Sequence, residues 1–233
     1  MGKVCNSNQI RKIPPDSGHV SFNNQTFMAE NSIQNKFHWY DGRFYDKVIA
    51  PNQKELFSQI IGLIKPKAKI IDVGCGTGFF SFSVAEKCTS VLGIDLSNKN
   101  IDRANRNLNR KSSAKLKFRH STIEELVSEN EHFDYAVMTY VIHEVNENER
   151  IPLLLEMSKV ADKIIIGDYL VPQPRSFSGK LTAMVEYIAG TEHYTNFRNY
   201  ERNGGIHYLA EKAGLSIETE IRNNTNHIVV LTK

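Results

Sequence analysis

Residues 70–80 read IIDVGCGTGFF. An apolar run leads directly into three glycines at alternate positions, Gly74, Gly76 and Gly78. Glycine permits a tight turn and lets a ligand lie against bare backbone, and the helix that follows presents unpaired N–H groups. The pattern therefore predicts a buried strand, a ligand-binding turn and a helix. A tight turn without a ligand is the alternative.

The spacing of the glycines separates two classes of ligand. The dinucleotide fingerprint requires G-x-G-x-x-G, and Phe79 occupies its third glycine position here. Gly78 instead completes a G-x-G-x-G pattern, and a bulky Phe79 at the helix start would hinder the approach of a pyrophosphate. The spacing thus disfavours an NAD-linked oxidoreductase, which stays open as an alternative.

A second landmark lies in residues 91–97, which read VLGIDLS. Asp95 stands at the end of this apolar run, 17 residues after Gly78. A carboxylate there can accept hydrogen bonds from both hydroxyls of a ribose lying over the glycine loop. Helix capping is the other role for such an aspartate, although Ser97 is able to fill it.

Apolar runs alternate with amphipathic stretches through the rest of the chain. We expect strands at 69–74, 90–95, 115–120, 133–139, 162–168, 215–222 and 226–232, and helices at about 52–64, 78–88, 98–110, 123–130, 148–161, 177–189 and 199–213. Repeated strand–helix alternation predicts an α/β fold with a mostly parallel sheet. The last two strands are separated only by residues 223–225 and predict an antiparallel hairpin, with helices on both faces of a seven-stranded sheet.

Three segments follow from these patterns. Residues 1–35 are rich in Asn, Gln and Ser and predict a flexible N-terminal arm. Residues 36–66 combine an aromatic cluster with a helix and predict an N-terminal cap or lid. Residues 67–233 form the main domain, in which 170–205 are an insertion before the final helix.

The composition is that of an ordinary soluble domain. The 29 Lys and Arg against 26 Asp and Glu give a net charge of +3, which requires no acidic partner. The densest basic stretch, residues 103–119, is typical of the solvated side of an amphipathic helix; a nucleic-acid patch is the alternative. No apolar run approaches the roughly 20 residues of a membrane-spanning helix. We therefore expect no membrane span, no nucleic-acid partner and a cytoplasmic location.

The cysteines and histidines give no sign of a structural metal. The three cysteines, Cys5, Cys75 and Cys88, are widely spaced and predict neither a disulfide framework nor a zinc knuckle. No two histidines share one expected element at ligand spacing. We expect no metal site.

The two landmarks together resemble those of the class I S-adenosylmethionine-dependent methyltransferases. Residues 72–78 look like the first motif of that family, 93–95 like the acidic end of its second strand, and 133–145 like its fourth strand and the following loop. The resemblance covers about residues 65–233 and implies a Rossmann-like sheet. It implies that S-adenosylmethionine is the cofactor, bound by Asp72, Gly74, Cys75, Gly76, Gly78, Asp95, Leu96, Thr122 and Ile123.

Within that set, the resemblance implies the methionine part of the cofactor against Asp72 and Gly74, its ribose on Asp95 and its adenine near Leu96 and Thr122-Ile123. The sequence departs from the family at one point. Many relatives carry an acidic or amide residue at the position of Ser121 or Thr122, where the adenine amine is met.

Methyl transfer from a sulfonium needs mainly alignment and exclusion of water, and a base only where the nucleophile starts protonated. The loop at 139–144 lacks the Asp/Asn-Pro-Pro-Tyr/Phe signature of enzymes that methylate nucleobase or glutamine nitrogens. The candidate catalytic residues are Tyr140, His143 and His193. The insertion resembles the substrate-covering segment of small-molecule methyltransferases, and the candidate substrate-binding residues are Trp39, Tyr40, Tyr45, Glu186, Tyr194 and Arg198.

The sequence thus predicts a methyltransferase, an enzyme that transfers a methyl group to a small molecule by in-line displacement. An enzyme acting on RNA or another macromolecule, and a non-catalytic S-adenosylmethionine-binding regulatory protein, are the alternatives. The acceptor atom, the substrate and the oligomeric state stay open.

Overall fold

A computed structural model describes residues 50–173 and 191–233. In chain order the elements are α1 (Ala50–Leu63), β1 (Lys69–Val73), α2 (Phe79–Val84), β2 (Ser90–Asp95), α3 (Asn98–Lys111), β3 (Leu116–His120), α4 (Ile123–Ser128), β4 (Phe133–Thr139), α5 (Glu147–Val160), β5 (Ala161–Tyr169), α7 (Thr191–Arg202), α8 (Gly205–Ala213), β6 (Ser216–Arg222) and β7 (Asn226–Thr232). The expected arm, residues 36–49 of the expected cap and the expected helix at 177–189 lie outside the described residues.

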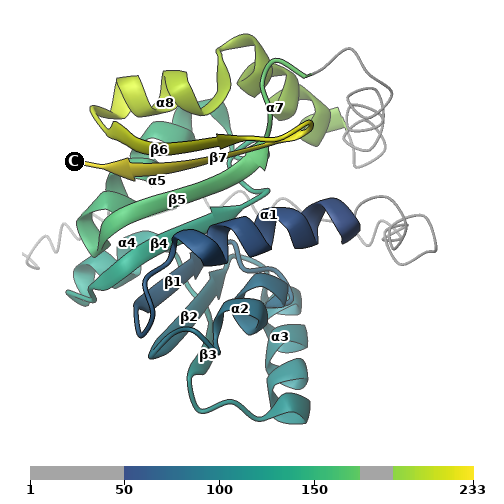
Figure 1. The fold of residues 1–233 in the computed structure, drawn as a ribbon, viewed down its shortest axis with the longest axis vertical. Coiled ribbons are helices and arrows are strands. Elements are labelled where there is room, and N and C mark those ends of the chain that lie inside the picture. The colour runs from purple at the N-terminus through teal and green to yellow at the C-terminus, as the bar shows by residue number, and fades with distance from the viewer. Residues whose placement is uncertain (1–49, 174–190) are drawn as a thin grey trace, which may run out of the picture. The chain divides into compact units, whose positions relative to one another are not determined.

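The seven strands form one sheet in the order β3-β2-β1-β4-β5-β7-β6 (Figure 1). β1 to β5 run parallel, β7 is antiparallel to β5, and β6 pairs antiparallel with β7. This confirms the predicted Rossmann-like sheet with its C-terminal hairpin. The order of the strands reverses between β1 and β4, and the loops that leave those two strands therefore border the crevice where ligands bind in open α/β sheets.

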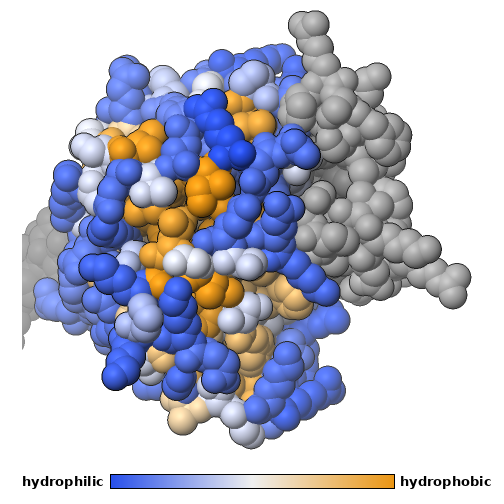
Figure 2. Space-filling view, in the orientation of Figure 1, coloured by the Kyte–Doolittle hydropathy of each residue, from blue (hydrophilic) through white to orange (hydrophobic). Residues whose placement is uncertain are grey.

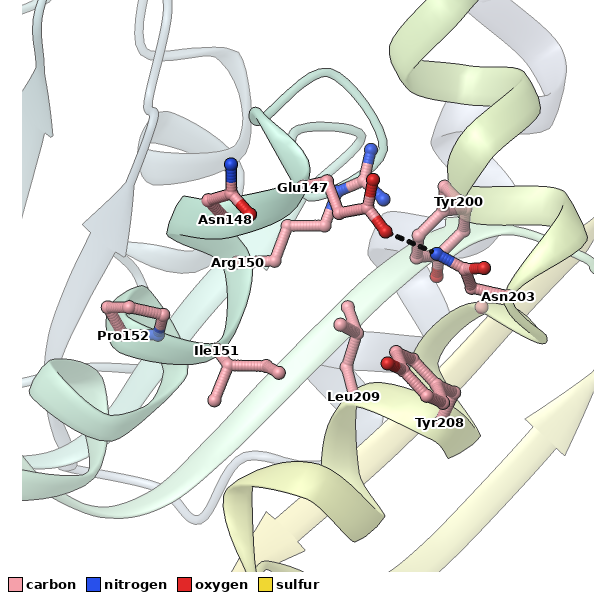
Figure 3. Close-up of a pocket in the computed structure, with 10 residues that line it drawn as sticks. Glu147, Asn148, Arg150, Ile151, Pro152, Tyr200, Asn203, Tyr208 and Leu209 are labelled. Carbon is pink, nitrogen blue, oxygen red and sulfur yellow. Dashed lines mark hydrogen bonds between the residues drawn. The ribbon is translucent and has the colours of Figure 1, made fainter.

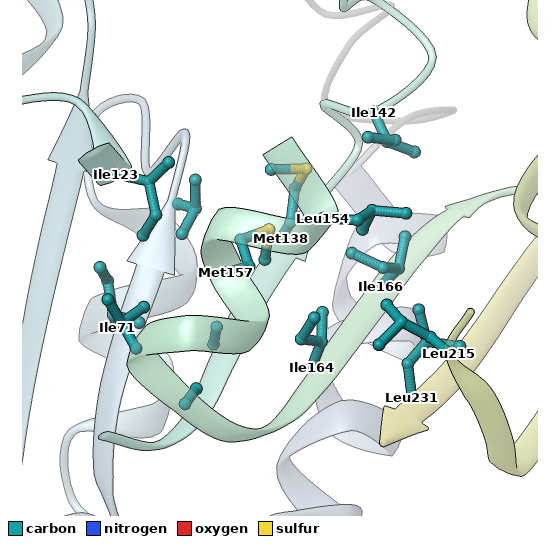
Figure 4. Close-up of a cluster of buried hydrophobic side chains, with 14 of the residues drawn as sticks. Ile71, Ile123, Met138, Ile142, Leu154, Met157, Ile164, Ile166, Leu215 and Leu231 are labelled. Atoms are coloured by element: carbon teal, nitrogen blue, oxygen red, sulfur yellow. The ribbon is translucent and has the colours of Figure 1, made fainter. Parts of the chain in front are cut away.

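Successive side chains along each strand point to opposite faces of the sheet, and they divide the core into two layers. On one face of the sheet Ile71, Met138 and Ile166 pack beneath α4, α5 and α8 (Figure 4). On the other face Ile70 and Ile165 belong to a second cluster, beneath α1, α2 and α3. Burial on both faces explains why these strands read as nearly continuous apolar runs.

The outward sides of the helices are polar. On α3, Ile101 and Ala104 are buried while Arg103, Arg106 and Arg110 are exposed, which is the expected solvated face. Hydrophilic residues cover most of the face seen in Figure 2, and hydrophobic residues gather in a band down its middle. Within the described ranges, no helix combines the length and the hydropathy that crossing a bilayer requires.

One expected helix is wrong. The segment 199–213 is not continuous, because Gly204 and Gly205 adopt φ values of +90° and +63° and separate α7 from α8. Positive φ values are rare for residues with a Cβ and end a right-handed helix. A Cβ at Gly205 would also lie 3.1 Å from the Cβ of Val171, so the break packs closely on the segment after β5.

Two glycines offer a matched test of how α1 lies on the sheet. A Cβ at Gly167 of β5 would lie 2.7 Å from Cδ1 of Ile60 and 2.9 Å from Cδ2 of Leu56, both buried on α1, whereas a Cβ at Gly62 would meet nothing within 4 Å. We expect Gly167→Ala to lower the free energy of unfolding by about 1–3 kcal/mol through overpacking. Gly62→Ala should raise it by up to about 1 kcal/mol through helix propensity.

Urea unfolding of both variants measures these changes. Adding Ile60→Val to Gly167→Ala removes the clashing Cδ1 and should recover part of the loss, as a double-mutant cycle would show. If Gly167→Ala unfolded at the same urea concentration as the wild type, α1 would not pack on β5 in this way.

Candidate functional site

The glycine loop follows β1 and is held by β2. The backbone N–H groups of Gly74 and Cys75 both donate to the carbonyl of Ile94 at 2.9 Å. Gly74 has φ +73°, and a Cβ there would lie 2.7 Å from Cγ2 of Val141. Gly76 has φ +54°, and a Cβ there would meet nothing within 4 Å. Close packing thus requires one glycine, and the other leaves open space over bare backbone, which is the form of a ligand cradle.

Asp72 is the buried acid of this site. Its side chain is almost fully enclosed, and Ser81 Oγ donates to Oδ2 at 2.5 Å. The other oxygen, Oδ1, has no hydrogen-bond partner among the described residues. Burial, reinforced by the charge of Asp95 and opposed by the Ser81 hydrogen bond, raises the pKa of Asp72 to about 7. A buried carboxylate oxygen without a partner is costly, and a cationic ligand group would satisfy it.

Asp95 links the glycine loop to α3. Its Oδ2 accepts from the N–H of Gly76 at 2.8 Å, and its Oδ1 accepts from the N–H of Ser97 at 2.8 Å and from Nδ2 of Asn100 at 3.4 Å. Ser97 caps α3 by accepting from the N–H of Asn100, so the aspartate is not the helix cap. An ionised carboxylate offers about four acceptor positions, and these three bonds leave one for a ligand hydroxyl.

The residues expected near the adenine differ in how far their side chains are available to a ligand. Leu96 stands 71 % exposed directly after Asp95. Thr122 caps α4 by accepting from the N–H of Glu125, and Ser121 donates to the carboxylate of Glu125 at 2.5 Å. The hydroxyls of Ser121 and Thr122 are therefore used within the fold. The side chain of Ile123 is buried in the core, so any contact with a ligand would come from its backbone.

Cys75 and Gly78 serve packing. Burial raises the pKa of the Cys75 thiol well above its usual range, helped by the charges of Asp72 and Asp95, so the thiol stays protonated and unreactive. A Cβ at Gly78 would lie 2.5 Å from the ring of Phe118. Both positions shape the loop from beneath.

The loop after β4 lies against the glycine loop through Val141 and Gly74. Its first residue, Tyr140, has a φ of +55°, which is uncommon for a residue with a side chain and typical of functional sites. The N–H of Tyr140 donates to the carbonyl of Gly167 at 2.8 Å, and its hydroxyl donates to Oδ1 of Asn226 at 3.0 Å. Tyr140 is thus fixed at the ends of β5 and β7.

His143 and Asp168 form a buried pair. Nδ1 of His143 lies 2.6 Å from Oδ1 of Asp168, and the backbone N–H of His143 donates to Oδ2 at 3.3 Å. Both side chains are at most 2 % exposed, and the imidazole lies against the rings of Tyr169 and Phe197. A carboxylate only accepts, so Nδ1 carries the proton and Nε2 holds the lone pair. This is the tautomer that a general base requires.

Arg150 fastens α7 to the same loop. Its buried guanidinium donates to the carbonyls of Val145 at 2.9 Å and His143 at 3.3 Å, and on α7 to the carbonyl of Asn196 at 2.7 Å and Oδ1 of Asn199 at 2.9 Å. Because the carbonyl of His143 is one of these acceptors, the position of the His143 backbone depends on Arg150.

A pocket of about 370 Å³ lies beside Arg150, between α5 and the α7–α8 pair (Figure 3). Glu147 and Asn203 face one another across it, joined by a hydrogen bond of 2.9 Å from Nδ2 of Asn203. None of the residues predicted to bind cofactor or substrate lines this pocket. It is therefore distinct from the glycine loop.

The α7 helix carries three of the predicted residues. Nδ1 of His193 lies 3.8 Å from Oε1 of Glu144, and Nε2 of His143 lies 3.8 Å from the same oxygen, so the structure brings the two histidines to one carboxylate. Arg198 pairs instead with Glu201 on its own helix. Tyr194 is half-buried on α7. The predicted substrate residues Trp39, Tyr40, Tyr45 and Glu186 lie outside the described residues.

Sequence reasoning missed three residues of this arrangement, Asp168, Arg150 and Glu144. Asp168 had a usable signal, because an acid at the end of the apolar run 164–167 must find a buried partner. Arg150 precedes the apolar run 151–155, which is a weaker signal of the same kind. Glu144 had none, because an acid in a loop is ordinarily solvated.

Residues 70–163 match the family model of a methyltransferase domain. Among curated proteins, the ubiquinone biosynthesis O-methyltransferase of Nitrosomonas europaea is 36 % identical over 113 residues, covering 47 % of this chain and 47 % of that protein. The protein of the same description from Nitrosospira multiformis is 29 % identical over 168 residues, covering 68 % of this chain and 67 % of that protein. The chain thus spans about half the length of the first relative.

Among solved structures, the magnesium protoporphyrin IX methyltransferase from Synechocystis PCC 6803 with bound SAH aligns with a TM-score of 0.60 at 17 % identity. The alignment covers 83 % of this chain and 90 % of that one, which shows a shared fold. The matched family model shows that residues 70–163 form a methyltransferase domain, and the strand order and the glycine loop agree with the resemblance to the class I S-adenosylmethionine-dependent methyltransferases.

Proposed function

We propose that this protein transfers the methyl group of S-adenosylmethionine to a hydroxyl of a small molecule. The observation that carries the proposal is the buried Asp72, whose Oδ1 lies without a hydrogen-bond partner in the described structure. It lies at the end of β1, directly before the open backbone of the glycine loop. A cationic amine next to a cradle for a flat nucleoside fits this arrangement, and an S-adenosyl ligand carries both.

The residues present fit that ligand group by group. Asp72 would accept from the ammonium of the methionine part, the remaining acceptor position of Asp95 would accept from the ribose, and the exposed Leu96 would support the adenine. When bound, the cofactor supplies an electrophilic methyl group on a sulfonium. The chain's own task is then to exclude water, to orient the acceptor and to remove its proton.

The acceptor atom is proposed from the His143–Asp168 pair. A hydroxyl must lose its proton as its oxygen becomes bonded to carbon. The lone pair on Nε2 of His143 would take this proton. Asp168 holds the imidazole at Nδ1 and would stabilise the imidazolium that forms. Two curated relatives are described as O-methyltransferases, which supports oxygen as the acceptor.

We also propose that the substrate is not a nucleic acid and that the protein acts in the cytoplasm. The exposed arginines of α3 form the solvent side of an amphipathic helix, so they give no support for a nucleic-acid substrate. Cys75 and Cys88 are buried free thiols, in keeping with the reducing cytoplasm as the proposed compartment.

Calorimetry with S-adenosylhomocysteine tests the cofactor. We expect Asp95→Ala to weaken binding by about 2–3 kcal/mol, or roughly 30- to 150-fold, because hydrogen bonds to a charged group are lost. Asp102→Ala removes an exposed acid of α3 and should leave binding unchanged. A variant Asp95→Ala that bound like the wild type, or a wild type that preferred NAD, would refute this reading of the loop.

Asp72 predicts how binding depends on pH. Because its pKa is raised to about 7, the ligand-free protein holds a proton there that a cationic ligand must displace. Affinity for S-adenosylhomocysteine should therefore fall below pH 7, at most about tenfold per pH unit. Titrations between pH 5.5 and 8.5 measure this, and Asp72→Asn should bind weakly with a flat profile.

The raised pKa of Asp72 also makes the stability of the fold depend on pH. A salt-bridged acid adds stability as the pH rises, whereas Asp72 removes stability. The unfolded chain ionises Asp72 near 3.8, so the ligand-free fold loses stability as the pH rises from about 4 to 7. Asp72→Asn lacks that loss. An equal pH dependence of wild type and variant, in both binding and urea unfolding, would contradict the assignment of Asp72.

His143 is tested by catalysis and binding together. With a panel of phenols and alcohols as acceptors and release of S-adenosylhomocysteine as the signal, His143→Gln should lower kcat about 100- to 10,000-fold and leave the affinity for the product cofactor unchanged. His132→Gln alters an exposed histidine that pairs with Asp162 at 2.9 Å, and it should change neither quantity. Wild-type kcat in His143→Gln would remove its role as a base.

A further inference from the structure

Three side chains from three different elements meet at the C-terminal edge of the sheet. They are His207 of α8, Glu220 of β6 and His227 of β7. Oε1 of Glu220 lies 3.0 Å from Nε2 of His207 and 2.6 Å from Nε2 of His227. The two imidazole rings are tilted by 40°, with centroids 5.1 Å apart. Both histidines thus direct the same nitrogen toward one carboxylate oxygen.

These atoms form a donor set that suits a metal ion. Two imidazole nitrogens and one carboxylate oxygen are ligands typical of Zn²⁺ and its neighbours in the first transition row. The three donor atoms all lie within 4.8 Å of one another. Ligands bound to one Zn²⁺ at about 2.0–2.2 Å stand roughly 3–4 Å apart. Small side-chain rotations would therefore place all three around one ion.

Among the described residues, Arg222 is a cation in contact with the cluster. Its Nε donates to Oε1 of Glu220 at 2.6 Å, and its Nη2 lies 3.3 Å from Nε2 of His207. The side chain of Arg222 is 54 % exposed, so it is free to turn toward solvent when another cation arrives.

We propose that His207, Glu220 and His227 bind a divalent transition-metal ion such as Zn²⁺, which fastens α8 to the C-terminal hairpin. Arg222 takes the place of the ion when no metal is bound. Three protein ligands leave at least one coordination position for water. None of the three belongs to the residues proposed for methyl transfer, so the site stands or falls separately from that function.

Zn²⁺ titration of the full chain, free of any affinity tag and stripped with a chelator, tests the site. We expect one ion per chain at this site, bound more than about tenfold more weakly by His227→Gln and by Glu220→Gln, since each loses a ligand. His132→Gln removes an exposed histidine that pairs with a different carboxylate, that of Asp162, and this variant should bind Zn²⁺ like the wild type. Co²⁺ should give a visible ligand-field absorbance that His227→Gln abolishes.

Arg222→Gln separates two explanations of the cluster most clearly, a metal site and a network of ion pairs, because the two predict different responses to Zn²⁺. If Arg222 competes with the metal, its removal tightens Zn²⁺ binding and enlarges the rise in Tm that Zn²⁺ produces. If the cluster is only a network of ion pairs, Arg222→Gln lowers Tm and Zn²⁺ has no added effect. That result, or equal affinity in wild type and His227→Gln, overturns the proposal. Calorimetry with S-adenosylhomocysteine should give the same affinity in all these variants, which separates this site from the proposed function.

Discussion

The arrangement of the site depends on one close approach, between the loop after β4 and the backbone of Gly74. A Cβ at that glycine would fall 2.7 Å from Val141, so only glycine lets the two loops meet. Because β1 and β4 are neighbours in the sheet, their loops leave at the same edge. The contact brings the segment containing His143 beside the segment containing Asp72. Every role proposed for these residues requires that proximity.

Buried polar groups hold the loop after β4 in place. Asp168 holds both the ring and the backbone of His143, and Arg150 holds the carbonyl of the same residue together with that of Val145. Arg150 also bonds to α7, so the helix that carries His193 and Tyr194 shares its anchor with His143. Buried hydrogen-bond networks of this kind favour a single geometry, since an unmade buried hydrogen bond is costly.

Much of the fold was predictable, because its signals are local. Apolar runs located all seven strands to within a residue or two, and the short spacing at 223–225 identified the hairpin. The glycine loop and Asp95 point to the candidate site through signals that are equally local. The predicted helix at 199–213 was wrong because two adjacent glycines look tolerable in a periodic pattern, while Val171, remote in sequence, favours the break. The pairing of Asp168 with His143 and the cluster at His207, Glu220 and His227 join residues far apart in the sequence, and no spacing within one element reveals these contacts.

The hairpin has a further consequence at the border of the sheet. β6 is an edge strand, and exposure alternates along SIETEIR, so that Glu218, Glu220 and Arg222 share its more exposed face. An open edge offers unpaired backbone groups to any extended chain, and charged side chains along it disfavour such additions. The strand that supplies the carboxylate of the histidine cluster therefore also protects the protein from edge-to-edge aggregation.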